Sequence, residues 1–164
     1  MPLIWYLKHP LVKLIRLSKY TTLFNTLSIK QQASFVLLNN QKKMTTQELA
    51  NRYYELFQKR QVAEIYQQLY SADIVCTEPE HALAMGVPTI TRGIDAVLAK
   101  SKARQETIAE VHSFFSSEPV VGGSYFSVAM GRDMTLKNGQ RLQLAEIAVF
   151  GVKDDKIISE TFFY

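Results

Sequence analysis

The last third of the chain holds four segments rich in Val, Ile, Phe and Tyr, separated by turn residues: 109–117, 124–136, 141–151 and 156–164. Such residues favour strands, and short turns join antiparallel neighbours. Asn138-Gly139 is the strongest turn pattern, because both central positions of a type I′ turn need a positive φ. Asp154-Asp155 predicts the next hairpin, at a higher conformational cost than Asp-Gly. The sequence therefore predicts an antiparallel meander.

Helical patterns precede this meander. Thr45 and Glu48 have the spacing of a capping box, in which both side chains satisfy free backbone donors at a helix start. Apolar residues follow at helical spacing, and a second such pattern begins at Val62. A third helix is predicted from Gly93 to about residue 108, with its charged residues Lys100, Lys102 and Arg104 facing water.

The segment between the second and third helices predicts a short strand at 74–78 and a loop at 79–91 that could move as a lid. Helices first and a meander afterwards indicate an α+β fold rather than a parallel α/β sheet.

Charge is unevenly distributed along the chain. Seven Lys and Arg residues and no acidic residue occur in residues 1–43, whereas residues 44–164 hold 12 basic and 15 acidic residues, a net charge of −3. No basic stripe for nucleic acid is expected in the second part. Residues 1–43 are predicted to be a basic extension, either disordered or not part of the native product, with membrane contact only if they are present and ordered.

Cysteine and histidine are too few and too scattered for several kinds of chemistry. Cys76 is the only cysteine, so an intrachain disulfide is impossible, and a reducing, cytoplasmic location with a buried structural thiol is the simplest interpretation. No His or Cys pairs have metal-ligand spacing, and Gly122-Gly123 lacks the context of a phosphate-binding loop. We expect neither metal nor cofactor.

Two carboxylates are candidate catalytic groups. A two-residue turn at Asn138-Gly139 would make Asp133 and Glu146 diagonal neighbours on one sheet face, beside Tyr125. Neighbouring carboxylates in a dry site resist losing both protons, so one could serve as acid and the other as base. The alternative is that they lie at a wet surface or in a dimer interface.

The opposite face is predicted to carry further ligand-binding residues and a possible ion pair between Arg132 and Glu160. Because both faces are largely apolar, a second copy of the chain is expected to cover one of them. His112 is a candidate base, with a structural or exposed histidine as the alternative. Glu78 flanks the pocket loop, where simple solvation is the alternative. The predicted substrate-binding residues are Tyr125, Arg132, Glu160, Phe162, Tyr164 and Glu78.

Several segments carry a family resemblance: TRGIDA at 91–96, EPVVG at 118–122, AEIAVF at 145–150, KDDKII at 153–158 and ETFFY at 160–164. With the order of elements, they resemble the SnoaL-like branch of the nuclear-transport-factor-2-like proteins over residues 44–164. The resemblance implies a curved antiparallel sheet that forms a cone-shaped pocket with N-terminal helices.

The resemblance leaves two functions open, because such folds serve both enzymes and binding modules. One is a small-molecule pocket protein acting as a cofactor-free isomerase, cyclase or hydrolase-like enzyme, with Asp133, Glu146 and His112 as catalytic residues. The other is a non-catalytic ligand-binding or dimerisation module. In both cases the expected partners are a small apolar molecule and a second copy of the chain.

Overall fold

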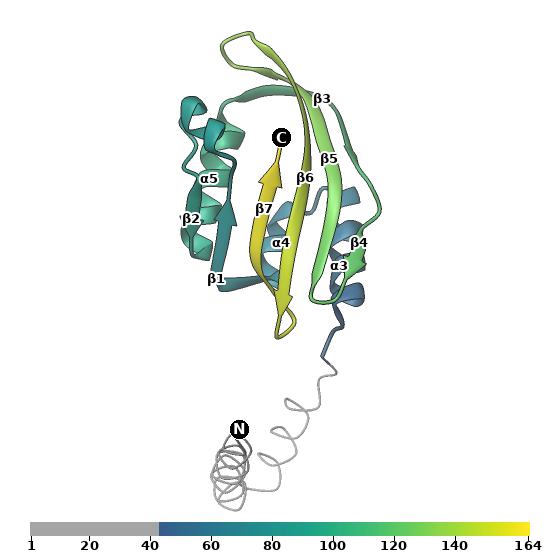
Figure 1. Cartoon of the computed structure of the whole chain (residues 1–164). Coiled ribbons are helices and arrows are strands. Elements are labelled where there is room, and N and C mark those ends of the chain that lie inside the picture. Colours follow the sequence, from purple (N-terminus) through teal and green to yellow (C-terminus); the bar gives the residue numbers. More distant parts are fainter. Residues whose placement is uncertain (1–42) are drawn as a thin grey trace, which may run out of the picture. The chain divides into compact units, whose positions relative to one another are not determined.

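The computed structural model describes residues 43–164, which form one unit of helices and a sheet (Figure 1). The predictions of an extension, its disorder and its membrane contact fall on residues 1–42, which lie outside the described residues. Lys43 belongs to the described part and forms an exposed ion pair with Asp154 at 2.7 Å. In residues 43–164, no helix has the length and apolar character needed to cross a membrane.

Three helices form where the sequence predicts them. The capping box is confirmed at the start of α3 (Thr46–Gln58), where the Thr45 backbone N–H donates to Glu48 Oε2 at 2.7 Å. The second helix is α4 (Val62–Leu69) and the third is α5 (Ile94–Glu106). A 3₁₀ helix, η1 (Glu80–Met85), lies within the predicted loop.

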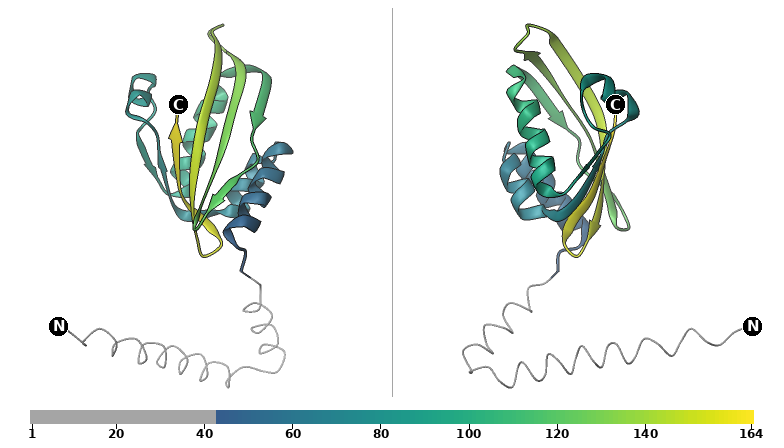
Figure 2. Two further views of the ribbon diagram at one scale, coloured as in Figure 1. Left: turned by 45° about the vertical axis from the view of Figure 1, so that its right-hand side comes forward. Right: turned by 90° about the vertical axis from the view of Figure 1, so that its left-hand side faces the viewer.

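Seven strands form one sheet in the order β2-β1-β7-β6-β5-β3, with β4 pairing to β5. Their bounds are β1 (Tyr70–Thr77), β2 (Ile90–Arg92), β3 (Ile108–Ser116), β4 (Val120–Gly122), β5 (Tyr125–Leu136), β6 (Arg141–Lys153) and β7 (Lys156–Phe163). The sheet is curved, and the long β5–β6 hairpin extends beyond the helices (Figure 2).

The sheet is mixed rather than purely antiparallel. Strand β1 pairs with β7 in parallel, while the other pairings are antiparallel. A parallel pairing needs a long connection, and here α5 and the whole meander lie between the two strands in the sequence. The meander β3–β7 itself has the antiparallel pairing that the sequence predicts.

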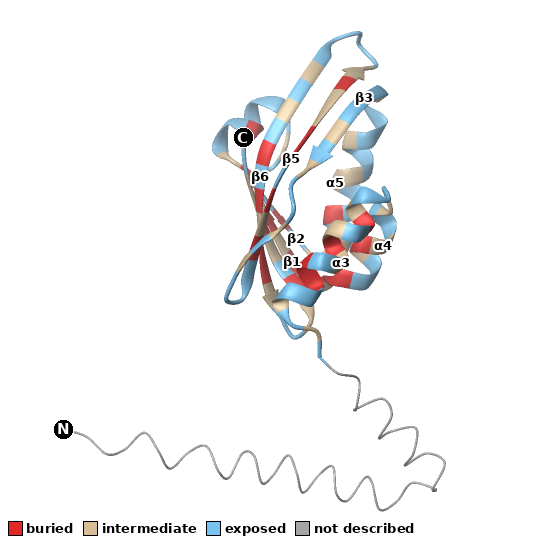
Figure 3. Cartoon of the chain, turned by 90° about the vertical axis from the view of Figure 1, so that its right-hand side faces the viewer, coloured by how far each residue is buried: buried red, intermediate tan, exposed pale blue. Residues whose placement is uncertain are grey.

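The three α-helices cover one face of the sheet, which we call the inner face; the opposite side is the outer face (Figure 3). The core lies between the helices and the inner face. Phe126 and Phe150 stack there at 4.6 Å between ring centroids, and Tyr53 of α3 packs on Phe150 at 4.7 Å. All three residues are at most 5% exposed. Burying such rings provides much of the stability of a small domain.

The β5–β6 hairpin has a different register from the predicted one. Met130 pairs with Glu146, and Asp133 pairs with Gln143. The loop contains three residues rather than two, because the Leu136 N–H donates to the Gln140 carbonyl at 2.8 Å. A slip of one residue moves a side chain to the other face. The prediction that Asp133 and Glu146 share a face is therefore wrong.

The remaining turns follow the sequence closely. Asp154 and Asp155 adopt φ of 50° and 62°, and Lys153 pairs with Lys156 across them, so this hairpin has the predicted two-residue turn. Gly123 has φ of 59° in the turn that joins β4 to β5. Beyond the Asp154-Asp155 turn the register of β7 shifts by one residue between Gly151 and Val152, so Glu160 pairs with Phe150.

Candidate functional site

Three glutamates lie buried together where β1, β6 and β7 run side by side. Glu78 follows β1 and is 5% exposed, Glu146 in β6 is 8% exposed, and Glu160 in β7 is 4% exposed. Glu160 pairs with Phe150 on β6 and with Cys76 on β1, both of which belong to the core. We call Glu78, Glu146 and Glu160 the inner carboxylates. Simple solvation, the alternative considered for Glu78, is excluded by its burial.

Glu160 is held by a tyrosine hydroxyl. Tyr70, at the start of β1, donates a short hydrogen bond to Glu160 Oε2. Burial raises the pKa of Glu160, and the bond from Tyr70 opposes that rise. The predicted ion pair with Arg132 does not form, and the Glu160 carboxylate accepts a hydrogen bond from the Tyr70 hydroxyl.

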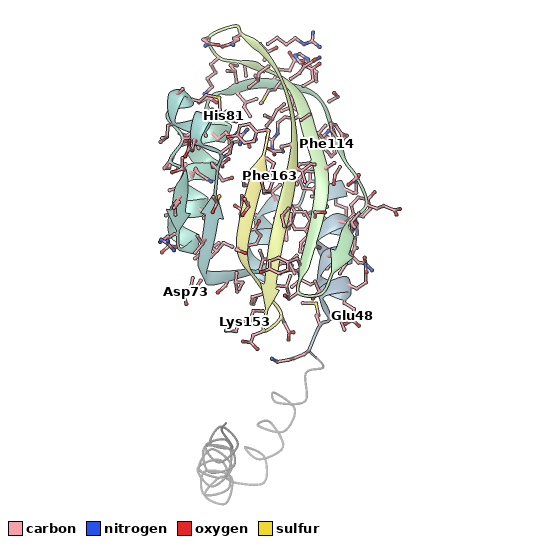
Figure 4. All side chains as sticks on the ribbon, viewed as in Figure 1. Glu48, Asp73, His81, Phe114, Lys153 and Phe163 are labelled. Carbon is pink, nitrogen blue, oxygen red and sulfur yellow. The ribbon has the colours of Figure 1, made fainter. Side chains whose placement is uncertain are left out.

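Glu78 is held by a lysine and a second tyrosine. Lys100 of α5 donates to Glu78 Oε1 at 2.9 Å, and Tyr164 donates to Glu78 Oε2 at 3.1 Å. Burial and the neighbouring Glu78 raise the pKa of Tyr164 to about 12, so this hydroxyl remains a donor. The Tyr164 ring also meets His81 edge-on, beside the C-terminal end of β7 (Figure 4).

Cys76 is fully buried in β1, where it pairs with Glu160 of β7 and contacts Lys100 of α5. Lys100 approaches its Sγ at 2.6 Å. Burial raises the pKa of Cys76 to about 12, although Lys100 opposes the rise. A thiol that keeps its proton is a poor nucleophile, so the structure favours the predicted structural role.

Glu146 differs from the other two inner carboxylates. Its Oε2 is buried and has no hydrogen-bond partner among residues 43–164. Burial raises the pKa of Glu146 above its ordinary value of 4.5, while Arg104 and Arg132 oppose the rise without bonding the carboxylate. A buried carboxyl with an unpaired oxygen and a raised pKa can take up or release a proton nearer to neutral pH.

Four of the predicted substrate-binding residues lie on the same side of the sheet as Glu78 and Glu146. Arg132, Glu160, Phe162 and Tyr164 alternate with the outer-face residues of β5 and β7 and so lie on the inner side. Lys100 stands 5.9 Å above the Phe162 ring. The inner side thus combines apolar rings with charged groups.

The other predicted site residues lie on the outer side. Asp133 forms a two-point ion pair with Arg141, at 2.9 and 2.7 Å, which lowers the pKa of Asp133 to about 2. His112 Nε2 lies 2.7 Å from the hydroxyl of Thr135, the strand neighbour of Arg141. Tyr125 is 57% exposed. None of these residues joins the inner carboxylates.

Lys100 and Arg104 were expected to face water but instead point toward the inner carboxylates. Val97, Lys100 and Arg104 recur at i, i+3 and i+7, so they share a face of α5, and Val97 is 1% exposed. That spacing from a buried valine could have identified the two cations. Nothing local to Tyr70 in the sequence marks it as a partner of Glu160, which is 90 positions away.

Metal binding has no structural support in the part of the chain described. No group of three or more His, Cys, Asp or Glu residues there is arranged to hold a metal ion. The inner carboxylates instead have ammonium, hydroxyl and guanidinium groups as their neighbours.

Comparison with known proteins gives a family and a fold. The family model of the SnoaL-like domain matches residues 44–164. No protein with a curated description matches. A proposed SnoaL-like polyketide cyclase from Mesorhizobium loti is 30% identical, with a TM-score of 0.67 over 74% of this chain and 100% of that one.

Two further structures share the fold at lower identity. A nuclear-transport-factor-2-like protein from Burkholderia pseudomallei is 22% identical, with a TM-score of 0.60 over 74% of this chain and 92% of that one. TerC, crystallised with polyporic acid, is 16% identical, with a TM-score of 0.59 over 73% of this chain and 92% of that one. These two likenesses concern the fold alone. The family match over residues 44–164 and the 30% identical relative from M. loti establish that the chain belongs to the SnoaL-like family.

Proposed function

We propose that this protein binds a small organic molecule at the inner face and moves a proton on it without a cofactor, using Glu146 as the acid/base group. The observation that carries the proposal is the buried Oε2 of Glu146, which has no hydrogen-bond partner among residues 43–164. A group that exchanges protons with a ligand needs an atom without a competing internal hydrogen bond, and a pKa shifted toward the working pH.

The other inner carboxylates are less suited to this role. Glu160 is bonded to Tyr70, and Glu78 is bonded to both Lys100 and Tyr164. These internal hydrogen bonds already stabilise both carboxylates, which makes each a weaker base than an unbonded one. Asp133 cannot assist from the outer face, so the proposed mechanism relies on one carboxylate rather than a pair.

Relatives give the proposal its chemical setting. The protein from M. loti is a proposed polyketide cyclase, and TerC was crystallised with polyporic acid. In the cyclisation of a polyketide, removal of a proton next to a carbonyl group produces the carbon nucleophile. A single buried carboxylate is a sufficient base for that step when the site also holds the resulting anion.

The test is proton exchange in heavy water. Enolisable ketones and 1,3-diketones are incubated with the protein in D₂O, and loss of the α-proton signal is followed by NMR. Glu146→Gln should slow the protein-dependent exchange by about 10² or more. Asp133→Asn, which removes a carboxylate from the outer face, should leave it unchanged. Undiminished exchange in a folded Glu146→Gln protein would refute the assignment.

A non-catalytic binding module is the second candidate. It is favoured by the internal hydrogen bonds of Glu78 and Glu160, which make much of the polar cluster a structural network. This function predicts that small molecules copurify with the protein, as detected by mass spectrometry, while no panel compound undergoes exchange above the rate in buffer.

We also propose a homodimer that covers the outer face. Ile147 and Phe163 pair across β6 and β7 and are 51% and 56% exposed, and Tyr125 lies on the same face. Large apolar side chains gathered on one sheet face favour association. Ile147→Lys should convert a dimer to a monomer in sedimentation equilibrium, whereas Gln143→Lys, near the exposed hairpin end, should not. A wild-type monomer at all concentrations would exclude this proposal.

A further inference from the structure

Two arginines beside Glu146 have no acceptor in the described chain. The guanidinium groups of Arg104 in α5 and Arg132 in β5 make no hydrogen bond or ion pair with any of residues 43–164, and only the backbone of each residue is bonded. Arg141 provides the contrast, because two of its nitrogens are bonded to Asp133 on the outer face. An arginine side chain has five N–H donors and stays charged in proteins.

Arg132 pairs with Leu144 across β5 and β6, so it is a diagonal neighbour of Glu146 on the inner face. Arg104 shares the face of α5 that carries the buried Val97. Burial lowers the pKa of Arg132, and the charge of Arg104 lowers it further. The positive charges of both arginines lower the pKa of Glu146, and that of Arg104 also lowers the pKa of Tyr164. Neither side chain belongs to the fully exposed class of residues. Glu146 offsets part of the repulsion between these two positive charges. Neither guanidinium group has a bonded acceptor among residues 43–164, however, so a further anion would stabilise both.

Because of this arrangement, we propose that Arg104 and Arg132 bind a carboxylate of the ligand, which makes the ligand an organic acid. The inference rests on the proposed binding of a small molecule at the inner face. The planar fork of arginine matches the two oxygens of a carboxylate, so two arginines fix its position and orientation.

This position of the carboxylate also places the rest of the ligand. Because Arg132 is a diagonal neighbour of Glu146, an anion bound to the arginines lies close to the unpaired Oε2. Met130 pairs with Glu146, and Phe162 lies on the next strand opposite Ala148, so apolar side chains adjoin the same spot. The ligand is thus an acid with an apolar body and a reacting carbon near Glu146.

A cationic ligand is the obvious alternative, because three carboxylates gather here. Two of them are already satisfied, however: Glu160 by Tyr70 and Glu78 by Lys100. The donors of Arg104 and Arg132 remain unused within residues 43–164. The site therefore has more unused hydrogen-bond donors than unused acceptors. An anionic ligand can accept from those donors.

The experiment compares 2-naphthoate with 2-naphthamide, which share a ring and differ in charge. Their dissociation constants are measured by NMR titration of the full chain. The wild-type protein should bind the carboxylate at least about tenfold more tightly than the amide, because hydrogen bonds to charged groups are the stronger ones. Arg104→Gln and Arg132→Gln should each remove most of that preference while leaving the amide affinity nearly unchanged.

Arg141→Gln is the matched control, since it removes the same charge from the outer face and should keep the preference. Thermal melts establish that each variant is folded. A wild-type protein that binds neither probe, or binds both equally, overturns the inference, as does a preference that survives loss of both arginines. These outcomes are independent of proton exchange in Glu146→Gln, so the two proposals fail separately.

Discussion

The bond between Tyr70 and Glu160 allows a quantitative test of the inner carboxylates. Tyr70→Phe removes only the hydroxyl that donates to Glu160, a residue 4% exposed. A hydrogen bond to a charged group contributes about 1.5–3 kcal/mol, against about 1 kcal/mol for a neutral one. At pH 8 we expect the free energy of unfolding to fall by about 2–3 kcal/mol, a drop in Tm on the order of 10 °C for a domain of this size.

The loss should depend on pH in a defined direction. The bond from Tyr70 lowers the pKa of Glu160, so the variant must have a higher Glu160 pKa than the wild type. The destabilisation is complete above both values, where Glu160 is charged. It shrinks toward about 1 kcal/mol as the pH falls through them and the carboxyl becomes protonated.

Urea unfolding between pH 4 and pH 8 measures this dependence. Tyr54→Phe is the control, because the Tyr54 hydroxyl has no partner among residues 43–164, and its loss should change stability by less than about 0.5 kcal/mol. If Tyr70→Phe costs no more than the control, or if its cost grows in acid, the reasoning is wrong.

Two further predictions concern single residues. Asp155→Gly should stabilise the domain by about 1 kcal/mol in urea unfolding, because Asp155 has φ of 62° and glycine adopts such angles without strain; a loss of stability would contradict this. The Cys76 thiol, with its pKa raised to about 12, should react with Ellman's reagent at pH 8 far more slowly in the native protein than in urea. Since it is the only cysteine, equal rates in both states would exclude a protected thiol.

Features that depend on neighbours in the sequence were predictable. The capping box of Thr45 and Glu48 begins α3, and the Asp154-Asp155 turn joins β6 to β7, because only local backbone geometry decides them. Alternation along β5 and β7 also placed Arg132 and Phe162 on a common face. That agreement results from two offsets that cancel, because the β5–β6 pairing differs by one residue from the predicted one and a register shift between Gly151 and Val152 moves β7 by one more.

The β5–β6 register was not predictable from the dipeptide. Asn138-Gly139 suits a two-residue turn, in which both residues have positive φ. Here only Gly139 does, at 85°, while the Asn138 side chain accepts from the Gln140 N–H at 3.0 Å. A three-residue loop results, and the Lys137 N–H is bonded to the carbonyl of Thr107, far away in sequence. The extra residue moves Glu146 to the inner face.

The partners of the inner carboxylates were also missed, for a physical reason. Lys100 is a long charged side chain on a helix, which usually lies in water. Its burial depends on contacts with Glu78 and Cys76, which lie at the end of β1 and reach Lys100 only once α5 packs against that strand. A sequence pattern gives the face of α5, but it does not show which acid that face meets.

The proposed function depends above all on a buried Glu146 carboxyl that has one oxygen without a hydrogen-bond partner among residues 43–164 and a raised pKa. The most direct measurement is a ¹³C NMR titration of the glutamate and aspartate carboxyls, with Glu146 assigned from the Glu146→Gln variant. Glu146 should titrate above 4.5, while Asp133 on the outer face should titrate at about 2. A Glu146 midpoint at or below 4.5 would contradict the burial of its charge and the acid/base role proposed from it.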